Sequence, residues 1–181
     1  MVFTYDTDMG LQAVVDLVNT DGSSSDDLTE VAQLDAFYQR WGYTGRHDRT
    51  RAELEDVRRI RPVMRELLLA DRDEAVHLVN KLLSDYGTTP QLVRHDETDW
   101  HIHASAEDRP YAERIIVETA MAMVDVIRTD ELSRLSICAD EGCEGVVVDL
   151  SRNRSKRYCS QTCTNRNAVA AYRERQGSAR K

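Results

Sequence analysis

All four cysteines of this 181-residue chain lie between positions 138 and 163. They form two close pairs, Cys138 with Cys143 and Cys159 with Cys163, and 15 residues separate the pairs. Four thiolates at short–long–short spacing are typical of a closed tetrahedral zinc site. The stretch contains no histidine, and because the cysteines fill all four ligand positions, none stays open for a catalytic water. The pattern therefore predicts one structural Zn²⁺ per chain.

Disulfide bonds and an iron–sulfur cluster are the alternative uses of four cysteines. Disulfides need an oxidising compartment, whereas the N-terminus MVFTYDTDMG lacks the basic start and apolar run of a signal peptide. No run of about 18 apolar residues exists, so we expect no membrane span. We expect a cytoplasmic protein with reduced thiols. The Arg-rich surroundings do not resemble the shielded environment of an iron–sulfur cluster, so zinc is favoured.

The residues around the cysteines predict the elements that hold the metal. Between the pairs, GVVVDLSRNRSKRY combines a β-branched run, a polar turn and a short return to Tyr158, which predicts a hairpin. After Cys159 there is no Gly or Pro before Gly177, so a helix is expected to begin near Gln161. Cys159 and Cys163 are four residues apart and can face one metal from its start. A knuckle, a hairpin and this helix make a treble-clef-like finger, which at this size seldom folds without metal.

Residues 138–175 resemble the CGNR zinc finger, whose Cys-Gly-Asn-Arg tetrapeptide reads Cys163-Thr164-Asn165-Arg166 here. The matching residues include the first cysteine pair, the run VVVDLSRNRSKRYCS and the run NRNAVAAYRER. In that family the finger follows an N-terminal domain called ABATE, and LQAVVDLVNT at residues 11–20 is similar to the opening helix of that domain. The resemblance implies a bacterial transcription regulator. Thr164 stands where the family has glycine, and threonine fits there if the position is helical.

Charge is divided unevenly along the chain. Residues 151–181 contain nine Lys or Arg and one acidic residue, a balance of +8, which leaves 15 basic and 31 acidic residues, a balance of −16, in 1–150. A compact basic segment on an acidic body is what phosphate neutralisation on duplex DNA needs. Part of the positive charge balances the four thiolates around Zn²⁺, which together carry about −2. The remaining positive charge could instead bind an acidic protein partner, which is the alternative to DNA.

Helix geometry sorts the basic side chains of this segment. Arg166 and Arg173 are seven residues apart and share a face of the predicted helix, so we expect both to contact DNA. Arg152, Arg154 and Lys156, in the predicted hairpin, are expected to add phosphate contacts.

A second stripe on the same helix predicts how the helix packs. Asn165, Val169 and Tyr172 follow a 0, +4, +7 pattern, which suits burial against the hairpin or the body. We therefore interpret Asn165 as a structural residue that bonds backbone near the zinc loop, with base readout as the alternative.

Residues 1–135 predict an α+β body that is mostly helical with one small β-hairpin, followed by the finger at 136–176 and a flexible tail at 177–181. Beyond the opening helix, helices are expected at 25–42, 50–70, 72–87 and 111–129. A Thr50–Glu53 capping box begins the second of these, and Pro62 should kink or divide it. Residues 90–105 predict two strands around an Asp-rich turn. The body is large enough to fold alone, and the short link predicts that the finger packs on it.

Two pairs of polar residues in the body are weaker candidates for sites. His101 and His103 alternate on one strand face, but no third metal ligand is evident, so we expect exposed strand histidines. Glu118 and Asp125 are seven residues apart on an otherwise apolar helix and are expected to mark its solvent edge.

Asp16, Asn19 and Thr20 belong to the segment similar to the ABATE opening. They are possible ligand-contacting residues, although Asn-Thr at a helix end more often forms a cap or a turn. The chain carries no P-loop, Gly-rich dinucleotide turn or nucleophile elbow, so we expect no enzyme. The leading hypothesis is a zinc-containing, DNA-binding transcription regulator whose body senses a small-molecule effector, forms a homodimer, or both. The alternative is a zinc-stabilised adaptor that binds another protein without direct DNA contact.

Overall fold

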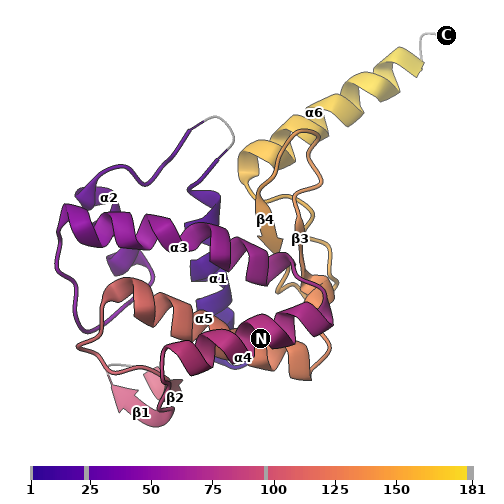
Figure 1. Ribbon diagram of the computed structural model, residues 1–181. Helices are drawn as coiled ribbons and strands as arrows, with labels where there is room; N and C mark the ends of the chain where they lie inside the picture. The colour runs from indigo at the N-terminus through magenta and orange to yellow at the C-terminus, as the bar shows by residue number, and fades with distance from the viewer. Residues whose placement is uncertain (1, 23–24, 96–97, 179–181) are drawn as a thin grey trace.

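The computed structural model describes residues 2–22, 25–95 and 98–178, and Figure 1 shows their arrangement. The described residues form helices and two small antiparallel hairpins. In chain order the elements are α1 (Tyr5–Asn19), α2 (Val31–Arg40), α3 (Arg51–Leu69), α4 (Arg72–Asp85), β1 (Gln91–His95), β2 (Thr98–His103), α5 (Tyr111–Arg128), a 3-10 turn (Leu132–Arg134), β3 (Leu135–Ile137), β4 (Val146–Val148) and α6 (Gln161–Ser178). The predicted α+β class, a helical body followed by a small finger, is confirmed.

The apolar helix α5 lies at the centre of the body, in contact with α1, α3 and α4. Side chains from these four helices form one buried cluster that includes Leu11, Met64 and Met123. A second cluster, around Leu34 and Tyr111, joins α2 to α1, α3 and α5. β1 and β2 form the predicted hairpin, with Leu92 opposite Ile102, and the predicted Asp-rich turn falls on residues 96–97, outside the described residues. No helix in the described part of the chain is both long and apolar enough to cross a bilayer.

Two details of the predicted helices differ from the structure. Helix α2 begins only at Val31, because Glu30 and Gln33 form a capping box there. Helix α3 begins as predicted, with the Thr50 side chain accepting the Glu53 N–H at 3.2 Å, but it is not divided at Pro62 and continues to Leu69. The helix is buried against the core on both sides of the proline, and this packing offsets the hydrogen bond that proline removes.

The finger contains a different hairpin from the predicted one. β4 pairs with β3, which precedes the first cysteine, so that Leu135 lies opposite Val148 and Ile137 opposite Val146. The residues after β4 form a polar loop instead of a return strand. Asp149 closes this loop by accepting the N–H groups of Ser151 at 2.8 Å and Lys156 at 2.7 Å. These bonds keep the pKa of Asp149 below its ordinary value, although burial, the largest single effect, acts in the opposite direction.

Helix α6 begins at Gln161, as predicted, and projects away from the body (Figure 1). It continues through Ser178, so it includes the first two residues of the predicted tail. The remaining three, 179–181, lie outside the described residues.

The finger packs on the body through β4, as the short link predicts. Val146 and Val148 are buried in the same cluster as Leu11 and Met64 of the body. Asn19, the last residue of α1, fixes the strand: its Nδ2 donates to the Val146 carbonyl at 2.8 Å, and its Oδ1 accepts the Val146 N–H at 2.7 Å. The finger and the body therefore share one apolar core.

Candidate metal centre and nucleic-acid surface

The fold brings the four predicted cysteines together. All four sulfur atoms lie within 4.8 Å of one another. The Sγ–Sγ separations are 3.6 Å for Cys143–Cys159, 3.8 Å for Cys159–Cys163 and 3.7 Å for Cys143–Cys163. A tetrahedron with Zn–S bonds of about 2.3 Å has edges of about 3.8 Å. The donor set and its geometry therefore fit one structural Zn²⁺ held by Cys138, Cys143, Cys159 and Cys163.

Two local turns deliver the ligands. Cys138 and Cys143 come from the turn after β3, where Gly142 has a φ of +75° and the Cys143 N–H bonds the Asp140 carbonyl at 3.0 Å. Cys159 and Cys163 come from the start of α6, where the Cys163 N–H bonds the Ser160 hydroxyl oxygen at 3.2 Å. The two cysteine pairs are also joined by a hydrogen bond, in which the Cys159 N–H donates to the Cys138 Sγ at 3.3 Å.

Electrostatics explain why this cluster needs a cation. Burial raises the pKa of the Cys159 thiol, and the neighbouring cysteines raise it further. Four thiolates this close repel one another unless a divalent ion lies between them. Zinc would supply that charge and keep each thiol deprotonated.

Asp140 lies in the turn between Cys138 and Cys143, the knuckle of the finger, and accepts hydrogen bonds from α6. Its side chain is only 4% exposed and accepts hydrogen bonds from Arg166 Nη1 at 2.7 Å and from Asn167 Nδ2 at 2.5 Å. Asn167 Nδ2 also donates to the Cys163 carbonyl at 3.0 Å. This pair of bonds ties the second cysteine pair to the first.

The structural role predicted for Asn165 is wrong, because Asn167 performs it. Asn165 is exposed, and its Oδ1 accepts a hydrogen bond from Gln161 on the preceding turn of α6. The predicted burial of the Asn165 stripe is also wrong, since Val169 is 48% and Tyr172 57% exposed. The helix points away from the body, so most of its side chains beyond Cys163 face solvent. Thr164 is helical, so the family glycine is not needed there for its backbone freedom.

Gly145 is required by close packing at the metal centre. A Cβ added there would lie 2.7 Å from Cys159 Sγ and 3.0 Å from Cys159 Cβ. We expect Gly145→Ala to destabilise the zinc site by about 1–3 kcal/mol, so that a chromophoric chelator removes zinc at least about fivefold more readily. The control is Gly10→Ala in α1, whose new methyl would meet Ala122 Cβ at an ordinary 3.7 Å. Equal zinc retention by both variants would contradict the steric argument.

The five basic residues predicted to contact DNA all lie on the finger, but only some of them are free of an ion-pair partner among the described residues. Arg154 pairs with Glu131 at 2.7 Å, and Arg166 pairs with Asp140 at 2.7 Å, so both charges already have partners. The other three, Arg152, Lys156 and Arg173, are exposed. Among the described residues none of these three side chains forms an ion pair.

The three possible ligand-contacting residues at the end of α1 all have structural partners. Asp16 accepts the Trp41 indole N–H at 2.9 Å and pairs with Arg40 at 3.3 Å. Thr20 bonds the Leu17 carbonyl at 2.6 Å, which is the cap that its position suggests. Asn19 holds β4 through both atoms of its amide. None of the three lines the cavity that the body forms between α1, β2 and α5.

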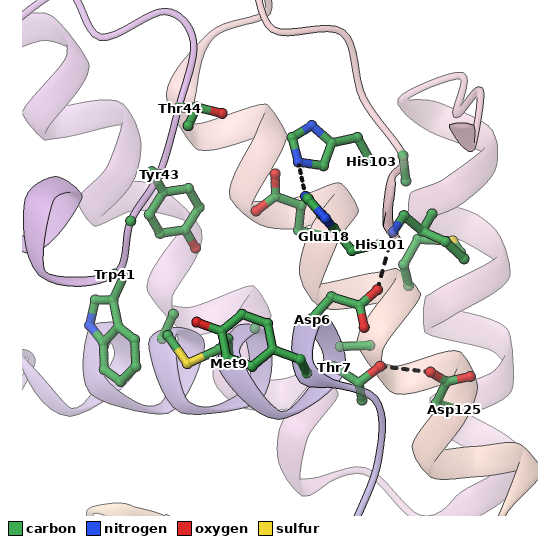
Figure 2. Close-up of a pocket in the computed structure, with 18 of the residues that line it drawn as sticks. Asp6, Thr7, Met9, Trp41, Tyr43, Thr44, His101, His103, Glu118 and Asp125 are labelled. Atoms are coloured by element: carbon green, nitrogen blue, oxygen red, sulfur yellow. Dashed lines mark hydrogen bonds between the residues drawn. The ribbon is translucent and has the colours of Figure 1, made fainter. Parts of the chain in front are cut away.

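That cavity is the feature that the sequence did not indicate (Figure 2). Glu118 and Asp125, which were predicted to mark a solvent edge, are partly exposed and line this cavity. His101 and His103 line it as well, with their Nε2 atoms 3.1 Å apart. Two acidic residues seven apart on an apolar helix were the available signal, but the residues facing them come from segments far away in the chain.

The body, the shared core and the four-cysteine centre define a small zinc-finger protein of two interlocked parts. Residues 11–130 match the family model ABATE, described as "Putative stress-induced transcription regulator", and residues 134–176 match the CGNR zinc finger. Because the first match spans well over half of the chain, the protein belongs to the ABATE family. Neither match is to an enzyme family. The sequence has no match among curated proteins.

Proposed function

We propose that this protein is a transcription regulator whose zinc finger binds duplex DNA through exposed basic side chains. The observation that carries the proposal is a set of cations on the loop after β4 and on α6 that are exposed and have no ion-pair partner among the described residues. They are Arg152, Lys156, Arg157, Arg173 and Arg175. Phosphate contacts from such side chains supply most of the sequence-independent affinity for DNA.

The shape of the finger supports the same proposal. Helix α6 extends from the metal centre into solvent (Figure 1). Most of the acidic residues of the chain lie in the body. A projecting basic helix can approach a duplex while the acidic body stays at a distance. Arg154 and Arg166 must exchange Glu131 and Asp140 for phosphate before they contribute, so we assign them a smaller share than sequence alone suggests.

Binding to duplex DNA should weaken steeply as salt is added. With five phosphate contacts, each contributing about 0.9, the slope of log affinity against log salt is expected to be about −4.5. Lys156→Ala or Arg173→Ala should reduce that slope by about one and weaken binding to all sequences alike. Fluorescence anisotropy with a labelled duplex measures both quantities.

The matched control is Arg59→Ala, since Arg59 is exposed on the body and already pairs with Asp56 at 2.6 Å. It should leave the slope unchanged, and zinc content must equal one per chain in every variant. A zinc-loaded protein with no measurable binding at low salt would refute the proposal.

A protein-binding adaptor is the second candidate, and one observation favours it. Val169 and Tyr172, three residues apart on α6, are 48% and 57% exposed, and such an apolar patch suits a protein partner. If Val169→Ala and Tyr172→Ala leave DNA affinity intact but abolish capture of a transcription component, the adaptor is the better description.

A further inference from the structure

The cavity of the body that Glu118 and Asp125 line has a volume of about 440 Å³ and lies between four segments. It is lined by the first half of α1, the residues around the end of α2, the end of β2 and the middle of α5 (Figure 2). A volume of this size accommodates a small organic molecule. The cavity is separate from the metal centre, because its lining includes no residue of the finger.

One side of the cavity is aromatic. Trp41 and Tyr43, from the chain after α2, line it together with Tyr5 and Met9 of α1. The indole of Trp41 is held by its hydrogen bond to Asp16 at 2.9 Å, so the wall does not depend on a ligand for its position.

The opposite side carries three carboxylates. Asp125 accepts the Thr7 hydroxyl at 2.6 Å, and Asp6 accepts the Ile102 N–H at 3.3 Å. Glu118 has neither a hydrogen bond nor an ion pair within the described part of the chain. Burial raises the pKa of Glu118 to about 7, and the charge of Arg114 opposes this only in part.

The cavity offers little positive charge in return. Arg40 is the one arginine among its lining residues, which include no lysine, and it pairs with Asp16 at 3.3 Å. An anionic ligand would therefore meet repulsion, and a neutral ligand would leave the Glu118 carboxylate without a counter-charge.

We propose that this cavity binds a small organic cation with an apolar group, such as an aryl-substituted primary amine. The ammonium group is neutralised by Glu118, with Asp6 and Asp125 adding negative potential, and the apolar group lies against Trp41 and Tyr43. Aromatic faces attract cations as well as apolar groups, so both parts of such a ligand are stabilised. The inference concerns the body alone and does not depend on whether the finger binds DNA.

A metal ion is the competing occupant, because His101 and His103 lie side by side. A stable site needs a third ligand atom close to both imidazoles. In the described part of the chain, the four cysteines are the one group of three or more ligand residues whose atoms lie within 4.8 Å of one another. The organic cation is therefore favoured over the metal.

The test uses the zinc-loaded full chain and three probes that share a phenyl ring: phenethylamine, 2-phenylethanol and phenylacetate. By calorimetry at pH 8 in phosphate buffer, we expect phenethylamine to bind at least about tenfold more tightly than 2-phenylethanol, and phenylacetate more weakly than either. Glu118→Gln should abolish the preference for the amine. Glu66→Gln, an exposed glutamate of α3 outside the cavity, should retain it.

Dependence on pH gives a second readout. Around Glu118 the titratable and charged groups are Arg114 and Tyr111 on its own helix, Tyr43 after α2, Asp6 on α1 and the two histidines of β2. Because the complex needs ionised Glu118, affinity for phenethylamine should rise with pH below about 7, by at most tenfold per unit from this group, and level off above it. Glu118→Gln should remove this rise in affinity.

Three outcomes would overturn the inference. The first is equal affinity for phenethylamine and 2-phenylethanol, and the second is no binding of phenethylamine at millimolar concentration. The third is stoichiometric uptake of Co²⁺ beyond the ion of the finger that His103→Ala abolishes, which would assign the cavity to a metal. DNA binding by the finger is measured separately and is unaffected by each of these results.

Discussion

Removal of zinc should unfold the finger and also destabilise the body. Ligation free energy is folding free energy in a unit of this size, and structural zinc contributes about 10–16 kcal/mol in isolated finger peptides. Without the metal, four closely spaced sulfur atoms lose the cation that holds them together. The loss extends beyond the finger because β4, which the metal helps to position, is packed into the body. We therefore expect a larger loss of stability than any single core substitution would cause.

The experiment compares Cys163→Ser with Thr162→Ser, a change at an exposed neighbour that is not part of the four-cysteine cluster. Elemental analysis should find one zinc per chain in the control and well under one in the variant. Thermal unfolding followed by circular dichroism should show a lower midpoint for the cysteine variant, in the signal of the body as well as of the finger. Retention of full zinc by Cys163→Ser, with an unchanged finger spectrum, would contradict the assignment of the ligands.

Replacing Val146 and Val148 together with alanine is expected to lower the free energy of unfolding of the body by roughly 3–5 kcal/mol. Both side chains are at most 2% exposed and lie among residues of the body, so four methyl groups are lost from one core and a cavity remains. Neither side chain is a ligand, so zinc content should stay at one per chain. Chemical denaturation measures the change.

Val169→Ala is the matched control, because the same change at a side chain that is 48% exposed should cost less than about 0.5 kcal/mol. A chain that ends at residue 135 extends the test, since it lacks both valines. The sequence predicted that residues 1–135 fold alone, a boundary that stays a prediction. The shared core leads us to expect a poorly cooperative transition for this fragment. A transition as stable as that of the full chain would restore the predicted boundary.

The features that the sequence indicated correctly rest on local signals. The spacing of the cysteines identified the metal site, and the hydroxyl of Thr50 and the absence of Gly or Pro after Cys159 located the starts of two helices. The features it did not indicate depend on residues far apart in the chain. Val146 pairs with Ile137 across the knuckle, which no local pattern specifies. The choice between Asn165 and Asn167 depends on where the buried Asp140 lies.

The pairing of Asn19 with Val146 limits how such fingers can be exchanged between proteins. The side-chain amide of Asn19 supplies one donor and one acceptor to β4, as a neighbouring strand would. A finger grafted onto a foreign body would leave these backbone groups of Val146 unsatisfied and its valines exposed. A finger can therefore be exchanged only between proteins that both have the asparagine at the end of α1 and the buried apolar residues against which β4 packs. The two parts are compatible only as a matched set.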